Sequence, residues 1–272
     1  MKYLTHIAFV GFLLFFFSST AYGDTHVRPF DTLYVWAESG LNVRDTPSTD
    51  GKKLGKLDYG EQIVALDWGS GQELTITAIK SQYIQSMKLA ALSYTGRWIP
   101  IDFEGQKGYV FDGFLSKLPT IKIAPDQHQA DIYRATESLE EYAARTFGML
   151  KKLSVIDTVY PIPSKPRELL DRNNPSRIIY KNGAILNNYM GEGYGGQELI
   201  VPNLSFREGF LLFAFLNPEI KILDKYPAQL QTNVGFIGGE IQKDVIRLEF
   251  ENYTAALKKV SGFVVISGFG TC

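Results

Sequence analysis

Short apolar runs separated by turn residues fill the segment 33–66, which reads LYVWAESGLNVRDTPSTDGKKLGKLDYGEQIVAL. Leu41 and Val43 alternate with polar neighbours, a Thr-Pro-Ser turn follows at 46–48, and another apolar run begins after Gly60. Proline restricts φ and serine can bond the local backbone, so both residues favour turns. Short strands with closely spaced turns predict a small all-β barrel, and not a helical domain.

An insert interrupts this pattern. About 30 residues separate Leu66 from Trp98, and the insert at about 69–96 is too apolar for a solvated loop. Leu74–Thr77 alternates like a strand. Four apolar residues instead follow helical spacing: Ile76, Ile79, Tyr83 and Met87. We therefore expect an extended hairpin or a short helix packed on the barrel, with a lid over a ligand groove as the alternative.

The pattern changes after Pro119. Thr136 is placed to cap an amphipathic helix that ends near Lys151–Lys152. The apolar face of this helix consists of Leu139, Tyr142, Ala143, Phe147 and Leu150. Ser205 and Glu208 form a capping box, in which the serine hydroxyl accepts from the Glu208 amide and the carboxylate reaches back. A second, deeply buried helix is predicted from there to about Leu216.

The rest of the C-terminal half predicts strands. Asn182-Gly183 is a strong hairpin dipeptide. The strands expected around it and near the C-terminus are 178–180, 184–190, 246–250 and 262–269. The glycine-rich segment Gly191–Gly196 has neither the lysine nor the helix of a phosphate-binding loop, so we interpret it as a hairpin loop. The alternative is a functional loop, in which the side chains of Glu192 and Tyr194 contact a ligand. Strands outnumber helices without alternating with them, which predicts an α+β domain with an antiparallel sheet.

The N-terminus has the features of a secretory signal peptide. Lys2 precedes the apolar run 7–17, and small residues follow up to Gly23, after which we expect cleavage. The run is short for a bilayer span, so no transmembrane anchor is expected after cleavage, and an uncleaved anchor is the alternative. The predicted location is therefore secreted or periplasmic. The expected organisation is signal peptide 1–23, barrel 24–118, linker 119–134 and α+β domain 135–272.

The composition limits the classes of function that the sequence supports. A hydrophobic content of 45% and a charged content of 21% are those of a globular protein. A formal net charge of -1 disfavours nucleic-acid binding, which needs a basic face. Cys272 is the single cysteine, so no internal disulfide can form. A thiol at the chain end lacks a shaped pocket for catalysis, although it leaves open a disulfide-linked dimer.

Several short motifs in 33–118 occur together. They are Leu41-Asn42-Val43-Arg44, Pro47-Ser48, Leu54-Gly55, Gly60-Glu61, Trp98-Ile99-Pro100-Ile101, Gly108-Tyr109-Val110 and Phe114-Leu115. In combination this segment resembles the bacterial SH3 domain, although the family has only a short connection where this chain has its insert. The resemblance implies a groove that binds a peptide or a cell-wall (peptidoglycan) component. The ligand-binding candidates are Trp36, Asn42, Arg44, Trp98, Tyr109 and Phe111. The structural alternative places Trp98 in the core and has Asn42 with Arg44 bracing a loop.

Proteins with such domains often also carry a cell-wall hydrolase, which needs recognisable catalytic residues. A cysteine peptidase or a zinc enzyme needs histidines, and only His26 and His128 follow the signal peptide. No G-x-S-x-G nucleophile elbow occurs. A glycosidase needs only two carboxylates, which leaves that class open. Its candidate carboxylates are Glu192, Glu198, Glu208 and Glu240.

These observations favour an exported, non-enzymatic binding protein that needs no metal and no cofactor. The first alternative is a cell-envelope hydrolase, a glycosidase or a peptidase-like enzyme, with the barrel as its targeting module. The second is an envelope assembly or structural factor that uses the apolar insert or Cys272 as its contact.

Overall fold

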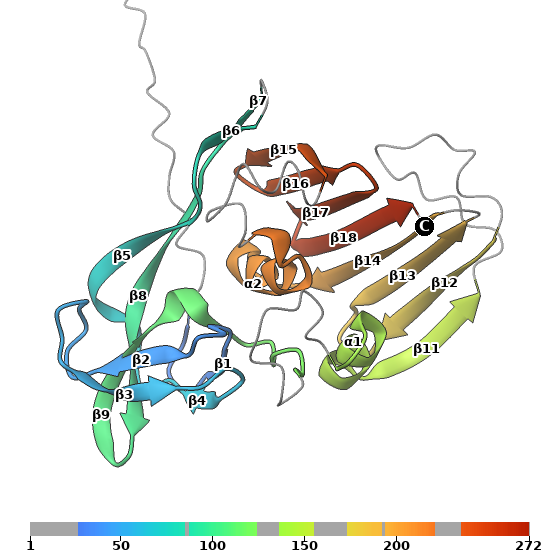
Figure 1. The fold of residues 1–272 in the computed structure, drawn as a ribbon. Coiled ribbons are helices and arrows are strands. Elements are labelled where there is room, and N and C mark those ends of the chain that lie inside the picture. Colours follow the sequence, from blue (N-terminus) through green and yellow to red (C-terminus); the bar gives the residue numbers. More distant parts are fainter. Residues whose placement is uncertain are drawn as a thin grey trace, which may run out of the picture.

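A computed structural model describes residues 27–84, 87–123, 136–154, 173–191, 194–220 and 235–271. The chain forms two parts that lie side by side (Figure 1). The N-terminal part covers residues 27–123 and the C-terminal part begins at residue 136. The helix α2 (Phe206–Leu216) lies between the SH3-like strands and the large C-terminal sheet (Figure 1).

The N-terminal part is built almost entirely of strands. Its elements are β1 (Thr32–Val35), β2 (Leu41–Arg44), β3 (Lys53–Leu57), β4 (Gln62–Val64), β5 (Ser70–Ile79), β6 (Gln82–Ile84), β7 (Met87–Leu89), β8 (Leu92–Phe103), β9 (Gln106–Phe111), η1 (Asp112–Phe114) and β10 (Leu115–Ser116). Two sheets, with the orders β3–β2–β9–β8–β5 and β10–β1–β4, enclose one core that includes Leu33, Val43, Ile99 and Val110. The segments before and after the insert therefore join in one sheet, as expected.

The insert is a long antiparallel hairpin, and the helical alternative is wrong. β5 pairs with β8, and β6 pairs with β7 beyond them. Hydroxyl groups face each other across the exposed side, where Thr75 contacts Thr95 at 3.0 Å and Thr77 contacts Ser93 at 3.1 Å. β-branched residues fit such a pleated surface, which favours strand over helix.

The hairpin packs on the C-terminal part, which corrects the expectation that it packs on the barrel. Its buried residues Ile79, Leu89, Leu92 and Tyr94 belong to the core of the C-terminal part. The rings of Tyr94 and Phe210 lie 6.3 Å apart, and β7 runs beside the edge strand β15 (Phe236–Gln242; Figure 1). The insert hairpin therefore connects the two parts through its buried side chains.

The C-terminal part is a sheet with helices on one face. Its further elements are α1 (Leu139–Phe147), β11 (Met149–Ser154), β12 (Asn173–Tyr180), β13 (Ile185–Gly191), β14 (Tyr194–Pro202), β16 (Val245–Phe250), β17 (Tyr253–Val260) and β18 (Phe263–Thr271). Among the described residues, eight strands form one antiparallel sheet in the order β11–β12–β13–β14–β18–β17–β16–β15. This confirms a C-terminal antiparallel sheet with two helices.

The helix α1 begins and ends at other residues than predicted. Its N-cap is Ser138, which forms a capping box with Glu141, whereas the Thr136 hydroxyl donates to the Lys122 carbonyl. The helix ends at Gly148, whose φ of 66° lies in the left-handed region that glycine adopts without strain. Leu150 and the two lysines after it therefore belong to β11, and the prediction that they end the helix was wrong.

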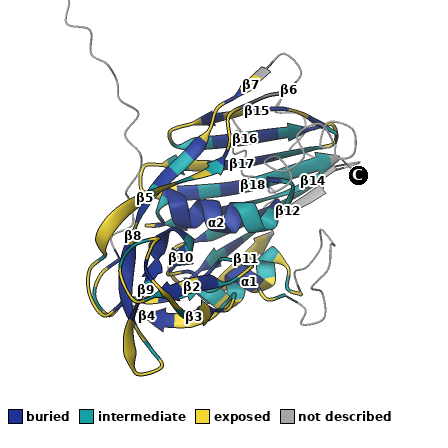
Figure 2. Ribbon diagram, turned by 60° about the vertical axis from the view of Figure 1, so that its left-hand side comes forward, coloured by how far each residue is buried: buried dark blue, intermediate teal, exposed yellow. Residues whose placement is uncertain are grey.

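The helix α2 follows the prediction closely. Ser205 and Glu208 form the capping box, and Asn217 is the C-cap. The helix is buried along its first eight residues (Figure 2) because the sheet covers one side and the N-terminal part another. A Cβ at Gly209 would lie 2.5 Å from Val264 of β18, so this close approach requires glycine.

The predicted hairpins are also present. Gly183, with φ of 86°, turns the chain between β12 and β13, and Gly191 pairs with Tyr194 where β13 turns into β14. The predicted signal peptide, most of the predicted linker, Glu192, both post-signal histidines and Cys272 lie outside the described residues. In the described ranges, no helix has the length and apolar character needed to cross a membrane.

Candidate functional site

Three of the six predicted ligand residues are buried, and the other three are exposed or half-buried. Trp36, Trp98 and Phe111 are 4–5% exposed. Trp98 and Phe111 pair across β8 and β9 with their rings 5.9 Å apart. The alternative interpretation of Trp98 as a core residue is therefore confirmed. Ligand contact by these three side chains stays a prediction that their burial does not support.

Trp36 connects the two parts. Its indole Nε1 donates to the Leu118 carbonyl at 2.9 Å. Its ring meets Tyr59 and Phe215 edge-on, at 6.5 Å and 6.2 Å, while the Tyr59 and Phe215 rings stack on each other at 5.8 Å. Since Phe215 belongs to α2, this aromatic cluster packs the N-terminal part against the helix.

Asn42 is exposed, whereas Arg44 and Tyr109 are half-buried, and we call these three residues the Arg44–Tyr109 face. Arg44 of β2 lies directly opposite Tyr109 of β9, and Asn42 lies two residues earlier on the same side of β2. The Arg44 Nη1 donates to the Gly51 carbonyl at 2.6 Å, which confirms that it braces the turn after β2. The Lys107 ammonium lies 5.2 Å from the centre of the Tyr109 ring. This face combines an amide, a guanidinium and an aromatic ring.

The sequence reasoning missed a second exposed surface. Val64, Leu66 and Trp68 occupy alternate positions along and beyond β4, and all three are exposed. Phe30 lies beside the Val64–Leu66 segment, because its amide donates to the Ala65 carbonyl at 2.7 Å, and it is 78% exposed. We call these four residues the apolar patch. The period-two spacing of Val64, Leu66 and Trp68 was the signal that could have revealed it.

Polar contacts fix the two parts to each other. Asp112 Oδ1 accepts from Arg207 Nη1 at 3.0 Å and from the Arg97 amide at 2.8 Å. Glu208 Oε1 accepts from the Lys117 amide at 3.0 Å and from the Ser116 hydroxyl at 3.3 Å. Glu208 therefore caps α2 and also binds the N-terminal part. This double structural role accounts for its burial without a catalytic function.

The described candidate carboxylates do not form a glycosidase pair. Glu198 and Glu240 lie in one row on the sheet face away from the helices, but β18, β17 and β16 separate their strands. Four strand spacings amount to about 19 Å, whereas paired catalytic carboxylates lie about 5 to 9.5 Å apart. Glu208 lies on the opposite side of the sheet, on α2. Glu198 instead accepts from Asn187 Nδ2 at 2.9 Å.

Metal ligands and buried tyrosines are the other candidates for catalytic groups in the described ranges. These ranges hold no group of three or more His, Cys, Asp or Glu side chains that could bind a metal ion. Burial raises the pKa of Tyr59, Tyr142 and Tyr189, which keeps these phenols neutral. The Tyr142 hydroxyl donates to the Pro119 carbonyl and so supports the junction between the two parts, whereas the Tyr59 hydroxyl donates to the Ile121 carbonyl within the N-terminal part.

Comparison with known proteins assigns one segment of the chain. Residues 39–116 match the family model of the bacterial SH3 domain. This range begins before β2 and ends with β10, and it contains the insert hairpin. No curated protein and no solved structure is detectably similar to the chain. The C-terminal part therefore has no assigned family.

Proposed function

Since residues 39–116 are a bacterial SH3 domain, we propose that the protein is an exported binding protein whose SH3 domain recognises a peptide or a cell-wall component. Bacterial SH3 domains are commonly cell-wall binding modules. The predicted signal peptide supports an extracytoplasmic location, where such a ligand is present. The C-terminal part contacts the SH3 domain through α2 and through the insert hairpin.

The observation that carries this proposal is the Arg44–Tyr109 face. Arg44 and Tyr109 are neighbours across β2 and β9, and the contacts with α2 are made elsewhere, by Trp36, Asp112 and Ser116. An aromatic ring beside hydrogen-bonding groups suits a ligand with both apolar and polar parts. We assign ligand contact to Asn42, Arg44 and Tyr109.

The test is co-sedimentation of the full chain with purified cell-wall sacculi. We expect saturable binding by the unaltered chain and at least about tenfold weaker binding by Tyr109→Ala, the loss typical of a central aromatic contact. Asn42→Ala should weaken binding by a smaller factor. Trp68→Ala is the matched control, because it removes an exposed aromatic ring from the apolar patch.

Three results would count against the proposal. If the unaltered chain does not sediment with sacculi, the cell-wall ligand is wrong, and the assembly role gains support. If only Trp68→Ala weakens binding, the ligand site is the apolar patch. A cleared band in a zymogram run with the same protein would contradict the non-enzymatic assignment.

A further inference from the structure

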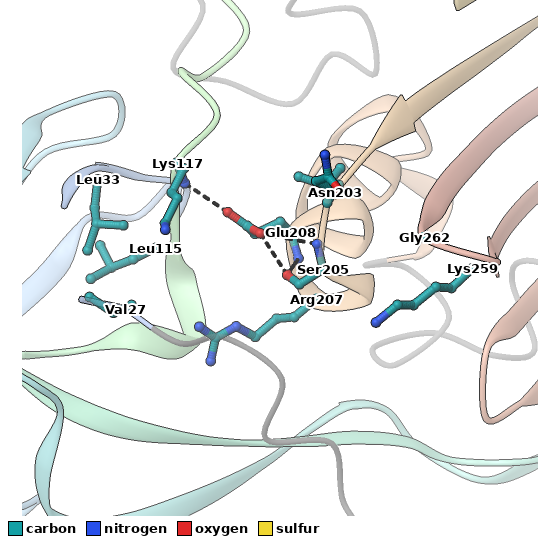
Figure 3. A pocket seen from close by; sticks show the side chains of 11 residues that line it. Val27, Leu33, Leu115, Lys117, Asn203, Ser205, Arg207, Glu208, Lys259 and Gly262 are labelled. Carbon is teal, nitrogen blue, oxygen red and sulfur yellow. Dashed lines mark hydrogen bonds between the residues drawn. The ribbon is translucent and has the colours of Figure 1, made fainter. Parts of the chain in front are cut away.

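Among the described residues, the C-terminal sheet has helices on only one of its two sides. The Phe147 ring of α1 lies 5.9 Å from the Tyr180 ring of β12, and α2 approaches Val264 of β18 on the same side (Figure 1). Where α2 meets the N-terminal part a cavity of about 330 Å³ remains, and Glu208 in its wall accepts from the Lys117 amide (Figure 3). The helix side of the sheet is therefore occupied by the chain itself.

An apolar row crosses four strands on the opposite side of the sheet. Ile179 of β12 pairs with Ile185 of β13. Ile200 of β14 pairs with Ile185 on one side and with Val265 of β18 on the other. These four side chains are half-buried and do not belong to the core of the C-terminal part. An antiparallel sheet that faces water on one side normally carries polar residues there, so this row indicates that a partner covers it.

The next row on the same side is more exposed. Phe263 of β18 pairs with Val260 of β17, and these side chains are 42% and 40% exposed. Apolar side chains in two adjacent rows form a continuous surface, and such a surface marks an interaction site. We call this surface the outer sheet face, and its residues are Ile179, Ile185, Ile200, Val260, Phe263 and Val265.

Charges of both signs border the outer sheet face. Lys151 pairs with Ile179 at one end of the apolar row, Lys258 pairs with Val265 at the other end, and both lysines are exposed. The neighbouring row on the same side contains Arg177 and Glu198. A lipid surface or a polyanion attracts charge of one sign. A second copy of this chain presents both signs, so it matches the mixed border better than either of them.

The size of the sheet also suits a second copy. Eight strands about 4.8 Å apart and about seven residues long, at about 3.3 Å per residue, present about 800 Å² on one side. A stable interface buries about 800 Å² on each partner. The outer sheet face covers β12, β13, β14, β18 and β17, with β11 beyond one end and β16 and β15 beyond the other. This arrangement gives an apolar centre and a polar rim.

We propose that two copies of this chain pack through their outer sheet faces as a non-covalent dimer. Sheets that pack face to face lie about 10 Å apart, and their apolar side chains interdigitate. Two-fold symmetry places the same residues on both sides of the interface. The dimer needs no disulfide through Cys272 and uses no residue of the Arg44–Tyr109 face, so it does not depend on the proposed ligand.

The test is sedimentation equilibrium of the full chain with a reducing agent present. We expect twice the mass of one chain, with a Kd of about 1 μM or tighter for an interface of this area. Val265→Lys places a charge inside the outer sheet face and should raise the Kd at least about 100-fold, because an unpaired charge is costly to bury. Phe263→Ser should raise the Kd about tenfold through the loss of apolar contact.

Two variants in the SH3 domain supply matched controls. Val64→Lys and Phe30→Ser make the same chemical changes at exposed residues of the apolar patch, and they should leave the Kd unchanged. Circular dichroism shows whether each variant keeps its fold. If Val265→Lys fails to fold, the comparison of Phe263→Ser with Phe30→Ser decides the question, because both side chains are already exposed.

Three results would overturn this proposal. The first is the mass of a single chain at all concentrations with the reducing agent present. The second is a dimer whose Kd changes in neither Val265→Lys nor Phe263→Ser. The third is a dimer that Val64→Lys and Phe30→Ser weaken as much as the two sheet variants do, which would assign the interface to the apolar patch.

Discussion

The guanidinium of Arg207 and the carboxylate of Asp112 form an ion pair that joins the two parts of the chain. Nη1 and Oδ1 are 3.0 Å apart, although the residues are 95 positions apart in the sequence. Their side chains are only 6% and 5% exposed. A buried ion pair of this kind fixes how the two residues are oriented toward each other. It adds little to the free energy of unfolding, because both charges have lost their hydration.

Removal of Asp112 from this ion pair should lower the free energy of unfolding. In Asp112→Ala the buried Arg207 cation keeps no counter-ion and the Arg97 amide loses its acceptor, so we expect a loss of about 3 to 5 kcal/mol in unfolding free energy. Urea denaturation measures this change. The control is Glu73→Ala, which breaks the exposed pair with Arg97, 59% and 56% exposed, and should cost less than about 1 kcal/mol. Equal losses in the two variants would contradict the assignment.

The insert hairpin should stabilise the C-terminal part through its buried side. Ile79→Ala removes a fully buried side chain from the shared core, and we expect a loss of about 2 to 5 kcal/mol. Thr77→Ala on the exposed side of the same strand should change stability by less than about 0.5 kcal/mol. Thermal unfolding compares them. A harmless Ile79→Ala would show that the hairpin does not pack on the C-terminal part.

The three tryptophans should differ in their access to solvent. Trp36 and Trp98 are buried, whereas Trp68 is 55% exposed in the apolar patch. Iodide should therefore quench one fraction of the fluorescence, and Trp68→Phe should remove that fraction. Persistent quenching in Trp68→Phe would mean that Trp36 or Trp98 reaches solvent. The same titration with sacculi present reports whether a ligand covers Trp68.

Stability should fall at alkaline pH, partly through Tyr94. Burial raises the pKa of Tyr94 to about 12, with Asp112 adding to the shift and Arg207 opposing it. The unfolded state releases this proton near the ordinary pKa of about 10, and the folded state does not. The stabilisation is therefore complete below about pH 10 and is lost as the pH rises to about 12.

Tyr94→Phe tests this linkage. The variant keeps the ring that packs against Phe210 and removes the ionisable group. Its unfolding free energy should decrease less steeply than that of the unaltered chain between pH 10 and 12. Urea denaturation across that range measures the slope. Identical slopes would assign the alkaline instability to the other buried tyrosines.

Local sequence patterns were sufficient to predict several helices and hairpins. The Ser205–Glu208 capping box, the apolar sequence after it and Asn217 predicted α2 with the bounds that the structure shows. The Asn182-Gly183 hairpin was equally clear. These features depend on contacts within a few residues, so the sequence around them holds the necessary information. The same reasoning failed for the first helix, since Gly148 ends it before the apolar spacing does.

The amino-acid sequence by itself determined the SH3 domain, the α2 helix and several of the antiparallel C-terminal strands. Only the tertiary structure decided that the insert packs on the C-terminal part and that Trp36 is buried against α2 while Trp68 stays exposed. Alternation along a strand shows that two side chains point to opposite faces. It does not show which distant element covers either face, because that depends on contacts between residues far apart in the chain.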